Sequence, residues 1–376
     1  MNKIIYISME PLTKYQNEAM YVSNMIDAGF NVSFWDLSWF WYADNKVQDN
    51  LSTDSHVVIF KSLEHFNRML KTVSIEDTAF IVNCFKDWHS RKIFRLLSKY
   101  RCYTISFDYN ANTRLQESIS SKINRLFSNQ FIGIVYKKIQ SVSFAIYRKI
   151  YSVKNFNDYI SSSAIAKCTI RINHQDFERF KFNNQRPIIS GPYIVFCDNY
   201  FPYHQDIVFL SGKTTINAED YHRTMRRFFD YLEEHFNMPV VIAAHPKSKY
   251  VGNEFGNRKI IKYQTDNLVY NSNRVILHTS NTISYVVLSD KPISFVSTDG
   301  YEKVDRLKTM IHLLANTFGK RVYNLDRIPF EMIDNNKIDR KLREKYIYTY
   351  LTSEETENTK NIEIISNAIK ALTYKL

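Results

Sequence analysis

The chain has 376 residues, of which 44% are hydrophobic, so it is long enough for two domains that each bury their own core. The hydrophobic content excludes disorder throughout, and the spacing of the eight glycines excludes a G-x-G-x-x-G dinucleotide fingerprint and a G-x-x-x-x-G-K-[ST] phosphate loop. The net charge of +12 suits three kinds of partner, namely nucleic acid, an anionic membrane or an anionic substrate.

The N-terminus starts with a strand-like apolar run and shows no signal-peptide pattern. The sequence contains no run of about 18 apolar residues, so we expect no membrane-spanning helix. The cysteines at positions 84, 102, 168 and 197 form no C-x-x-C pair, which favours buried thiols over a disulfide scaffold or a zinc site. We therefore expect a cytoplasmic protein.

The first half of the chain alternates between strand-like and helix-like patterns. The predicted strands are Lys3–Ser8, Asn31–Leu37, His56–Phe60, Ala79–Cys84, Cys102–Phe107 and Lys167–Ile172. The predicted helices are Tyr15–Ala28, which Gly29 ends, Leu63–Lys71 and His89–Lys99. This alternation predicts βαβ units, and therefore a parallel sheet with helices on its faces.

A basic and aromatic stretch, residues 118–156, interrupts this alternation. It holds no acidic residue between Ser118 and Asn157. Helical spacing relates Ile132, Val135, Tyr136 and Ile139. A basic helix with an aromatic face can lie in the headgroup layer of an anionic membrane, and an ordinary packed helix with a solvated basic edge is the alternative. The predicted membrane contacts are Lys137, Lys138, Arg148 and Lys149.

A polar segment, Phe177–Pro192, is the predicted hinge before a second alternating half. The predicted strands there are Tyr193–Asp198, Pro239–Ala244, Ile260–Tyr263, Arg274–His278, Pro292–Val296 and Arg321–Leu325. The predicted helices are Ala218–His235 with Asn217 as its N-cap, Thr282–Ser289, Glu302–Phe318, Ile338–Leu351 and Glu354–Leu372.

Two of these strands end in residues that suit an anion. His245-Pro246 follows Pro239–Ala244, and Thr279-Ser280-Asn281-Thr282 follows Arg274–His278. Hydroxyls and backbone N–H groups at a helix start bind phosphate, and ligands of α/β sheets collect at the carboxyl ends of strands. The two segments therefore predict a phosphate-binding site in the second half.

Two α/β halves with phosphate signals only in the second resemble a GT-B glycosyltransferase. The H-P pair and the following Ser/Thr-rich segment resemble the HP and SS motifs of bacterial sialyltransferases, polysialyltransferases and capsular Kdo transferases. The resemblance covers mainly Tyr193–Val296, and it includes Tyr193–Asp206, which resembles a segment of O-antigen surface-polysaccharide proteins. It implies two Rossmann-like domains with a cleft between them, followed by C-terminal helices.

The implied domains are an acceptor-side domain over residues 1–182, a nucleotide-sugar domain over 190–350, and a C-terminal helix over 351–376 that packs back on the first domain. The implied donor is a CMP-activated ulosonic acid, and the implied acceptor is a glycan or lipid-linked glycan of O-antigen or capsule. The enzyme would then work at the inner face of the cytoplasmic membrane.

By the same resemblance, His245 contacts the cytidine phosphate or supports its departure, Pro246 sets the turn and Lys247 adds charge. An imidazole at a strand end can donate to a phosphate oxygen. Hydroxyls and N–H groups of Thr279, Ser280, Asn281 and Thr282 would bind the phosphate, although such residues also serve as plain helix caps.

Transfer also needs a carboxylate, as base or as nucleophile. The related enzymes place it in a D/E-D/E-G motif before H-P, which this chain lacks. Asp198 is the predicted catalytic carboxylate, and a turn-forming role is its alternative. The secondary candidates are His204, Asp206, His278 and Asp299.

No D-x-D or H-E-x-x-H pattern occurs, so we expect no metal and no cofactor besides the donor. A CDP-polyol phosphotransferase of the teichoic-acid type is the alternative activity. A non-catalytic nucleic-acid-binding protein is a further alternative, although no recognised module supports it and we expect no nucleic-acid partner.

Overall fold

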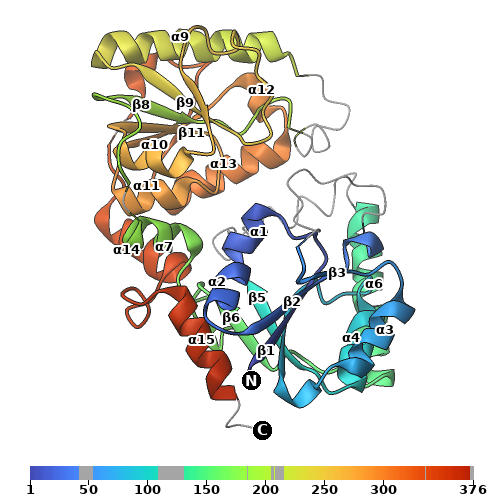
Figure 1. The fold of residues 1–376 in the computed structure, drawn as a ribbon. Helices are drawn as coiled ribbons and strands as arrows, with labels where there is room; N and C mark the ends of the chain where they lie inside the picture. The colour runs from blue at the N-terminus through green and yellow to red at the C-terminus, as the bar shows by residue number, and fades with distance from the viewer. Residues whose placement is uncertain are drawn as a thin grey trace. The chain divides into compact units, whose positions relative to one another are not determined.

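The computed structural model describes residues 1–41, 54–108, 131–183, 185–204, 207, 216–334 and 336–372. They form two compact units, each described by itself below (Figure 1). Unit 1 takes the described residues up to Gln175 and those from Thr352 onward. Unit 2 takes those from Asp176 to Leu351.

Unit 1 contains a parallel sheet of seven strands in the order β3-β2-β1-β4-β5-β6-β7. The strands are β1 (Lys3–Ser8), β2 (Asn31–Asp36), β3 (Val57–Ile59), β4 (Thr78–Asn83), β5 (Tyr103–Asp108), β6 (Asp158–Ser161) and β7 (Ile170–Arg171). β6 is missing from the sequence prediction, and β7 covers only part of the predicted Lys167–Ile172.

Both faces of this sheet are buried, because successive side chains of a strand point to opposite faces. Ile4 and Tyr6 of β1 belong to one core and Ile5 and Ile7 to the other. The first core includes side chains of α2 (Val22–Asp27) and α15 (Asn361–Ala371). The second includes side chains of α3 (Leu63–Thr72) and α4 (Arg91–Lys99).

The predicted helix Tyr15–Ala28 is two helices in the structure, α1 (Lys14–Ala19) and α2. Tyr21 between them has a φ of 59°, in the left-handed region that a continuous helix cannot contain. Gly29 ends α2 with a φ of 87°. The basic stretch supplies α6 (Phe131–Ile150), and residues 118–130 lie outside the described residues.

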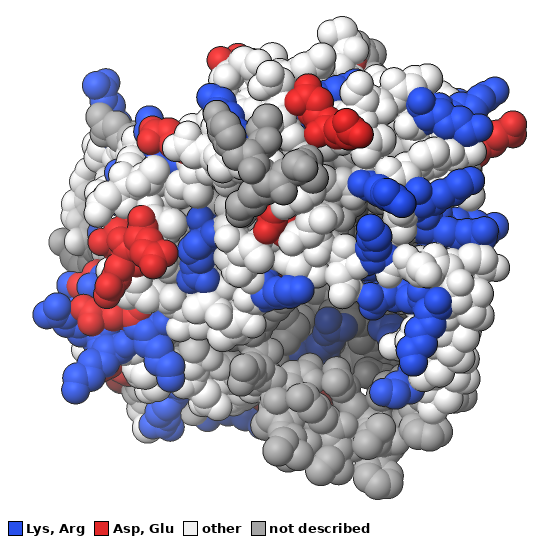
Figure 2. All heavy atoms as spheres, turned by 90° about the horizontal axis from the view of Figure 1, so that it is seen from below, with Lys and Arg blue, Asp and Glu red and all other residues white. Residues whose placement is uncertain are grey.

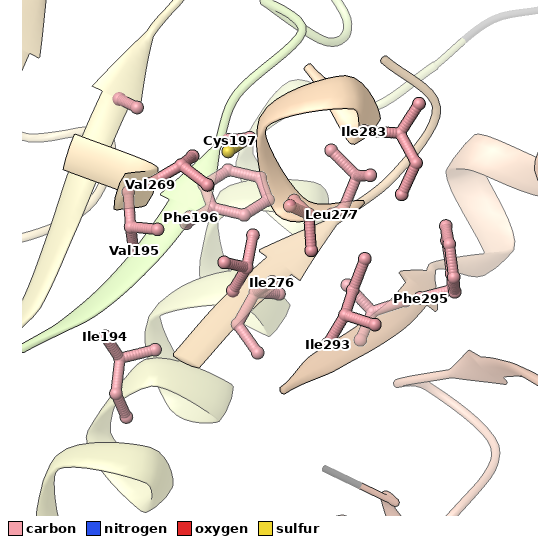
Figure 3. Close-up of a cluster of buried hydrophobic side chains, with 14 of the residues drawn as sticks. Ile194, Val195, Phe196, Cys197, Val269, Ile276, Leu277, Ile283, Ile293 and Phe295 are labelled. Carbon is pink, nitrogen blue, oxygen red and sulfur yellow. The ribbon is translucent and has the colours of Figure 1, made fainter. Parts of the chain in front are cut away.

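Unit 2 contains a second parallel sheet, with six strands in the order β10-β9-β8-β11-β12-β13. The strands are β8 (Ile194–Cys197), β9 (Val240–Ala244), β10 (Ile260–Lys262), β11 (Arg274–Leu277), β12 (Ile293–Ser297) and β13 (Val322–Asn324). Its core gathers side chains such as Phe196, Ile276 and Phe295 from adjacent strands, packed with Ile283 of α11 (Figure 3).

The helices of unit 2 are α7 (Gln175–Phe182), α9 (Ala218–Phe236), α10 (Thr265–Asn271), α11 (Ile283–Ser289), α12 (Asp299–Glu302), α13 (Asp305–Thr317) and α14 (Arg340–Tyr346), which continues as a π-helix over Ile347–Leu351. Short 3₁₀ helices are Ser38–Phe40 and Ile75–Asp77 in unit 1 and Phe330–Met332 in unit 2.

Three sequence predictions for this part of the chain can be compared with the helices of unit 2. The Asn217 side chain accepts from the N–H groups of Glu219 and Asp220, so its predicted N-cap role is confirmed. The predicted helix Glu302–Phe318 is confirmed as α13 over Asp305–Thr317, but its first residue, Glu302, belongs to α12, and a break separates the two helices. The predicted hinge overlaps α7 over Phe177–Phe182, and Phe177 is buried in the unit 2 core.

Candidate functional site

The predicted site residues of unit 2 lie at the carboxyl ends of four adjacent strands. β9, β8, β11 and β12 are neighbours in the sheet, and they end directly before His245, Asp198, His278 and Thr298. Parallel strands present their carboxyl ends at one edge, where open α/β sheets bind ligands. The sheet order thus brings together loops that are up to 100 positions apart, from Asp198 to Thr298.

Asp198 is buried and holds two of these loops together. Its Oδ1 accepts from the backbone N–H of Tyr200 at 2.9 Å. Its Oδ2 accepts from the Tyr250 hydroxyl at 2.8 Å and from the backbone N–H of His245 at 3.4 Å. Burial raises the pKa of Asp198 to about 6, while these three hydrogen bonds act in the opposite direction. The carboxylate therefore connects the loop after β8 to the H-P loop after β9.

His245 is half-buried at the start of the H-P loop. Its Nδ1 accepts from the backbone N–H of Lys247 at 3.1 Å, so the neutral ring carries its proton on Nε2. The ring of His204 lies edge-on to it, with the ring centroids 4.8 Å apart. Pro246 and Lys247 are exposed. The loop thus places an imidazole ring and an ammonium group at the sheet edge.

The Thr279 side chain lies in a small polar cluster beside this edge. Its hydroxyl is 2.7 Å from the hydroxyl of Tyr301 on α12, and the Asn199 side chain donates to that same hydroxyl at 3.4 Å. Burial raises the pKa of Tyr301 to about 12, so its phenol stays protonated at neutral pH. The cluster joins the loops after β8 and β11 to α12.

The rest of the T-S-N-T segment forms a turn before α11, which begins at Ile283 and not at Thr282. Ser280 accepts from the backbone N–H of Thr282 at 3.2 Å, and the Thr282 side chain makes no cap hydrogen bond. Asn281 is exposed. The segment supplies polar groups at the sheet edge, but its own side chains already satisfy part of the turn.

His278 is a core residue whose ring nitrogens are both occupied. Nδ1 donates to the Val296 carbonyl at 2.6 Å, and Nε2 accepts from the Tyr221 hydroxyl at 2.9 Å. The ring stacks on Tyr301 with centroids 4.7 Å apart. Burial lowers the pKa of His278 to about 4. The neutral ring therefore packs in the core beneath the sheet edge and holds the start of the loop after β11.

The two remaining acidic candidates are Asp299 and Asp206, and the structure describes only Asp299. Asp299 accepts from Arg327 Nε at 2.6 Å and from the Asn324 side chain at 2.9 Å, next to β13 at the end of the sheet. Asp206 lies outside the described residues. Within the described part of the chain, no three His, Cys, Asp or Glu side chains gather closely enough to hold a metal ion.

Sequence reasoning missed three side chains that shape this site, namely Tyr250, Tyr301 and His222. Tyr250 lies only four positions after the H-P pair, so its nearness in the sequence was a signal for its contact with Asp198. Tyr301 lies on a separate helix, α12, and no local pattern of the sequence indicates its role. His222 of α9 is 2% exposed, neither ring nitrogen has a hydrogen-bond partner among the described residues, and burial lowers its pKa to about 4.

No protein-family model matches this sequence, and no curated protein matches it. Solved structures do match the fold of this chain over nearly its whole length. CalG4, the calicheamicin glycosyltransferase, has 8% sequence identity and a TM-score of 0.50, covering 100% of this chain and 99% of its own. The fold is GT-B. The predicted fold class, two Rossmann-like domains with parallel sheets, is thereby confirmed.

Two further structures cover similar shares. The glycosyltransferase SnogD from Streptomyces nogalater has 9% identity and a TM-score of 0.49, covering 98% of this chain and 99% of its own. The wall teichoic acid polymerase TagF has 10% identity and a TM-score of 0.49, covering 100% of this chain and 90% of its own. Identities this low leave substrate and mechanism to the residues of the site itself.

Proposed function

We propose that this chain is a glycosyltransferase that moves a CMP-activated ulosonic acid, similar to sialic acid or Kdo, onto a lipid-linked surface glycan such as O-antigen or capsule. The observation that carries the proposal is the convergence of the H-P and T-S-N-T loops at one sheet edge of unit 2. The GT-B fold supports it, and so does the resemblance of these two motifs to those of CMP-sugar enzymes.

In this proposal the H-P loop stabilises the departing CMP. Nε2 of His245 donates to a phosphate oxygen, because Nδ1 is held by the backbone N–H of Lys247. The exposed Lys247 ammonium adds a positive charge beside it. Ser280, Asn281 and the turn that they form supply further polar groups. A monophosphate leaving group treated in this way needs no metal ion.

Asp198 is the proposed carboxylate. A pKa near neutrality suits a general base, and burial raises the pKa of Asp198 to about 6. Oδ2 uses both of its lone pairs on His245 and Tyr250, whereas Oδ1 accepts only from Tyr200, so the second lone pair of Oδ1 can accept from an acceptor hydroxyl. Its hydrogen bonds equally fit a residue that only positions the H-P loop.

A donor screen in EDTA tests the reaction. We expect product with a CMP-ulosonate and a lipid-linked glycan, and none with CDP-glycerol, UDP-sugars or GDP-sugars. His245→Ala should lower turnover by about a hundredfold or more, as loss of one transition-state donor does. His312→Ala removes an exposed histidine of α13 and is the matched control.

Product with CDP-glycerol alone would replace the proposal by the teichoic-acid type of transfer. Tight, salt-sensitive binding of oligonucleotides without CMP binding would favour the non-catalytic alternative. Full turnover in His245→Ala would remove that imidazole from the site.

A pair of variants separates the two roles of Asp198. Asp198→Asn removes the charge, whereas Tyr250→Phe removes one hydrogen bond and keeps the carboxylate. If Asp198 is the base, we expect Asp198→Asn to abolish transfer with CMP affinity retained, and Tyr250→Phe to keep most of the turnover. Equal losses in both variants would leave Asp198 as a positioning residue only.

A further inference from the structure

Helix α6 of unit 1 carries an exposed row of large apolar side chains. Val135, Ile139, Val142, Ile146 and Ile150 are 39%, 58%, 51%, 54% and 68% exposed. Nothing in the described part of the chain covers them. Soluble proteins rarely leave a row of large aliphatic side chains exposed to water. This row, here called the α6 stripe, therefore marks an interaction surface.

The spacing of the stripe shows that it is one continuous face. Its members are separated by four, three, four and four positions, so at about 100° per residue they fall within a sector of about 80°. Phe144, on the opposite side, is buried, and Tyr147, about 100° from the middle of the stripe, packs edge-on against Trp88 with centroids 6.1 Å apart. The C-terminal half of the helix is thus anchored by one side, and the stripe runs over a length of about 22 Å.

The charged residues of α6 are all positive. Lys138 and Lys149 project directly beside it by the same helical geometry, and both are exposed. Lys137 and Arg148 project nearer the anchored side, where the Arg148 guanidinium donates to the Asn155 side chain at 2.5 Å. No acidic residue occurs between Ser118 and Asn157, so nothing on this segment offsets the lysines.

The neighbouring helix adds to the same field. α4 contacts α6 and bears the exposed side chains of Lys92, Arg95 and Lys99. Figure 2 shows Lys and Arg gathered on the right of this face, the side on which α3, α4 and α6 lie in Figure 1, with few Asp and Glu among them. An apolar row within a cationic field matches the surface of an anionic bilayer.

We propose that unit 1 docks on an anionic lipid bilayer through the α6 stripe, with α6 lying in the headgroup layer and Lys138 and Lys149 on lipid phosphates. No helix in the described part of the chain is long and apolar enough to span a membrane. A helix of this type lies in the interface plane, about 5–10 Å into the boundary of headgroups and acyl chains. The docking is independent of the transfer reaction proposed above.

A second copy of the chain is the competing occupant, because the stripe has near-heptad spacing. A coiled coil places the residues that flank the apolar seam close to those of its partner, and opposite charges there stabilise it. The charged residues of α6 beside the stripe, Lys138 and Lys149, lie on one flank and have no acidic partner on this helix, so two copies would gain no ion pair across the seam. The charge pattern therefore favours lipid.

Sedimentation of the full chain with vesicles tests the proposal. We expect binding to vesicles of equal parts phosphatidylcholine and phosphatidylglycerol, weak binding to phosphatidylcholine alone, and loss of binding at high salt. Ile139→Ser with Ile146→Ser should lower the partition coefficient at least tenfold. The matched control is Ile165→Ser with Ile188→Ser, two exposed isoleucines elsewhere, which should bind like wild type.

The charge arm uses Lys138→Ala with Lys149→Ala. We expect each lost lysine to lower anionic-vesicle binding about fivefold, with little change on phosphatidylcholine. Lys341→Ala with Lys345→Ala removes the same charge from α14 and should leave binding unchanged. Circular dichroism of each variant confirms folding. Unchanged vesicle binding in the isoleucine double variant overturns the proposal, and so does a wild-type dimer that this variant converts to monomer.

Discussion

Asp198 shows how a single buried charge can set the shape of the site. Its three hydrogen bonds join the loops after β8 and β9, but they do not compensate fully for the loss of water. Its pKa is therefore raised from 3.8 to about 6. The folded chain binds this proton more tightly than the unfolded chain does, which ties the stability of the fold to pH.

This linkage has a definite sign. The stabilisation is complete below the unfolded pKa of about 4 and is lost as the pH rises through the folded pKa of about 6. Asp198→Asn has no such titration. We expect the free energy of unfolding of the wild type, relative to this variant, to fall by on the order of 3 kcal/mol between about pH 4 and about pH 7.

Urea denaturation of both proteins across this pH range measures the difference. Asp27→Asn, which removes an exposed carboxylate of unit 1, is the matched control. A difference between wild type and Asp198→Asn that stays flat across the range would contradict the raised pKa.

At the scale of elements, one buried asparagine holds the C-terminal segment to unit 1. The Asn173 side chain donates to the carbonyls of Thr356 and Thr359 at 3.0 and 2.8 Å, and accepts from the Thr352 hydroxyl at 2.6 Å. Its backbone N–H donates to the Asn361 side chain at 2.7 Å. These bonds fix the loop that leads into α15, whose Ile365 and Ile369 complete a core.

Asn173→Ala removes all three side-chain bonds and leaves buried groups without partners. We expect the free energy of unfolding to fall by about 2–4 kcal/mol, with faster proteolysis near α15. Urea denaturation and limited proteolysis of the full chain measure this. Asn253→Ala, at an exposed position, is the control, and an equal small effect in both variants would show that the network contributes little.

At the scale of the whole molecule, the site belongs to unit 2 and the α6 stripe to unit 1. Each unit has a sheet covered on both faces by its own core, so the two surfaces rest on separate scaffolds. A ligand of the H-P and T-S-N-T loops binds the folded chain alone, because the loops converge only when the sheet of unit 2 is formed. The nucleotide binding proposed above would therefore stabilise the protein against heat.

We expect CMP at about a hundredfold excess over its Kd to raise the free energy of unfolding by about 2.7 kcal/mol. Thermal unfolding with CMP, CDP, UDP and GDP measures the preference, and cytidine nucleotides should give the larger shifts. The shift should shrink in His245→Ala. A larger effect of UDP or GDP than of CMP would contradict the proposed donor.

Most strands could be predicted, because a buried parallel strand is a continuous apolar run. β1, β2, β4 and β9 lie within about one residue of their predicted bounds. β6 is short and was missed because two of its four residues, Asp158 and Ser161, are polar. The break at Tyr21 was also missed, since helical spacing continues through it and only the backbone angle reveals it.

The sequence by itself determined that the chain has two α/β halves and that polar loops follow the strands of the second half, because both depend on local runs of residues. Only the tertiary structure decided which side chains of those loops contact one another and which are buried. The occupied ring of His278 and the three bonds of Asp198 depend on Tyr221, Val296 and Tyr250, which other elements supply. Burial and pairing are properties of neighbours in space, which no local pattern encodes.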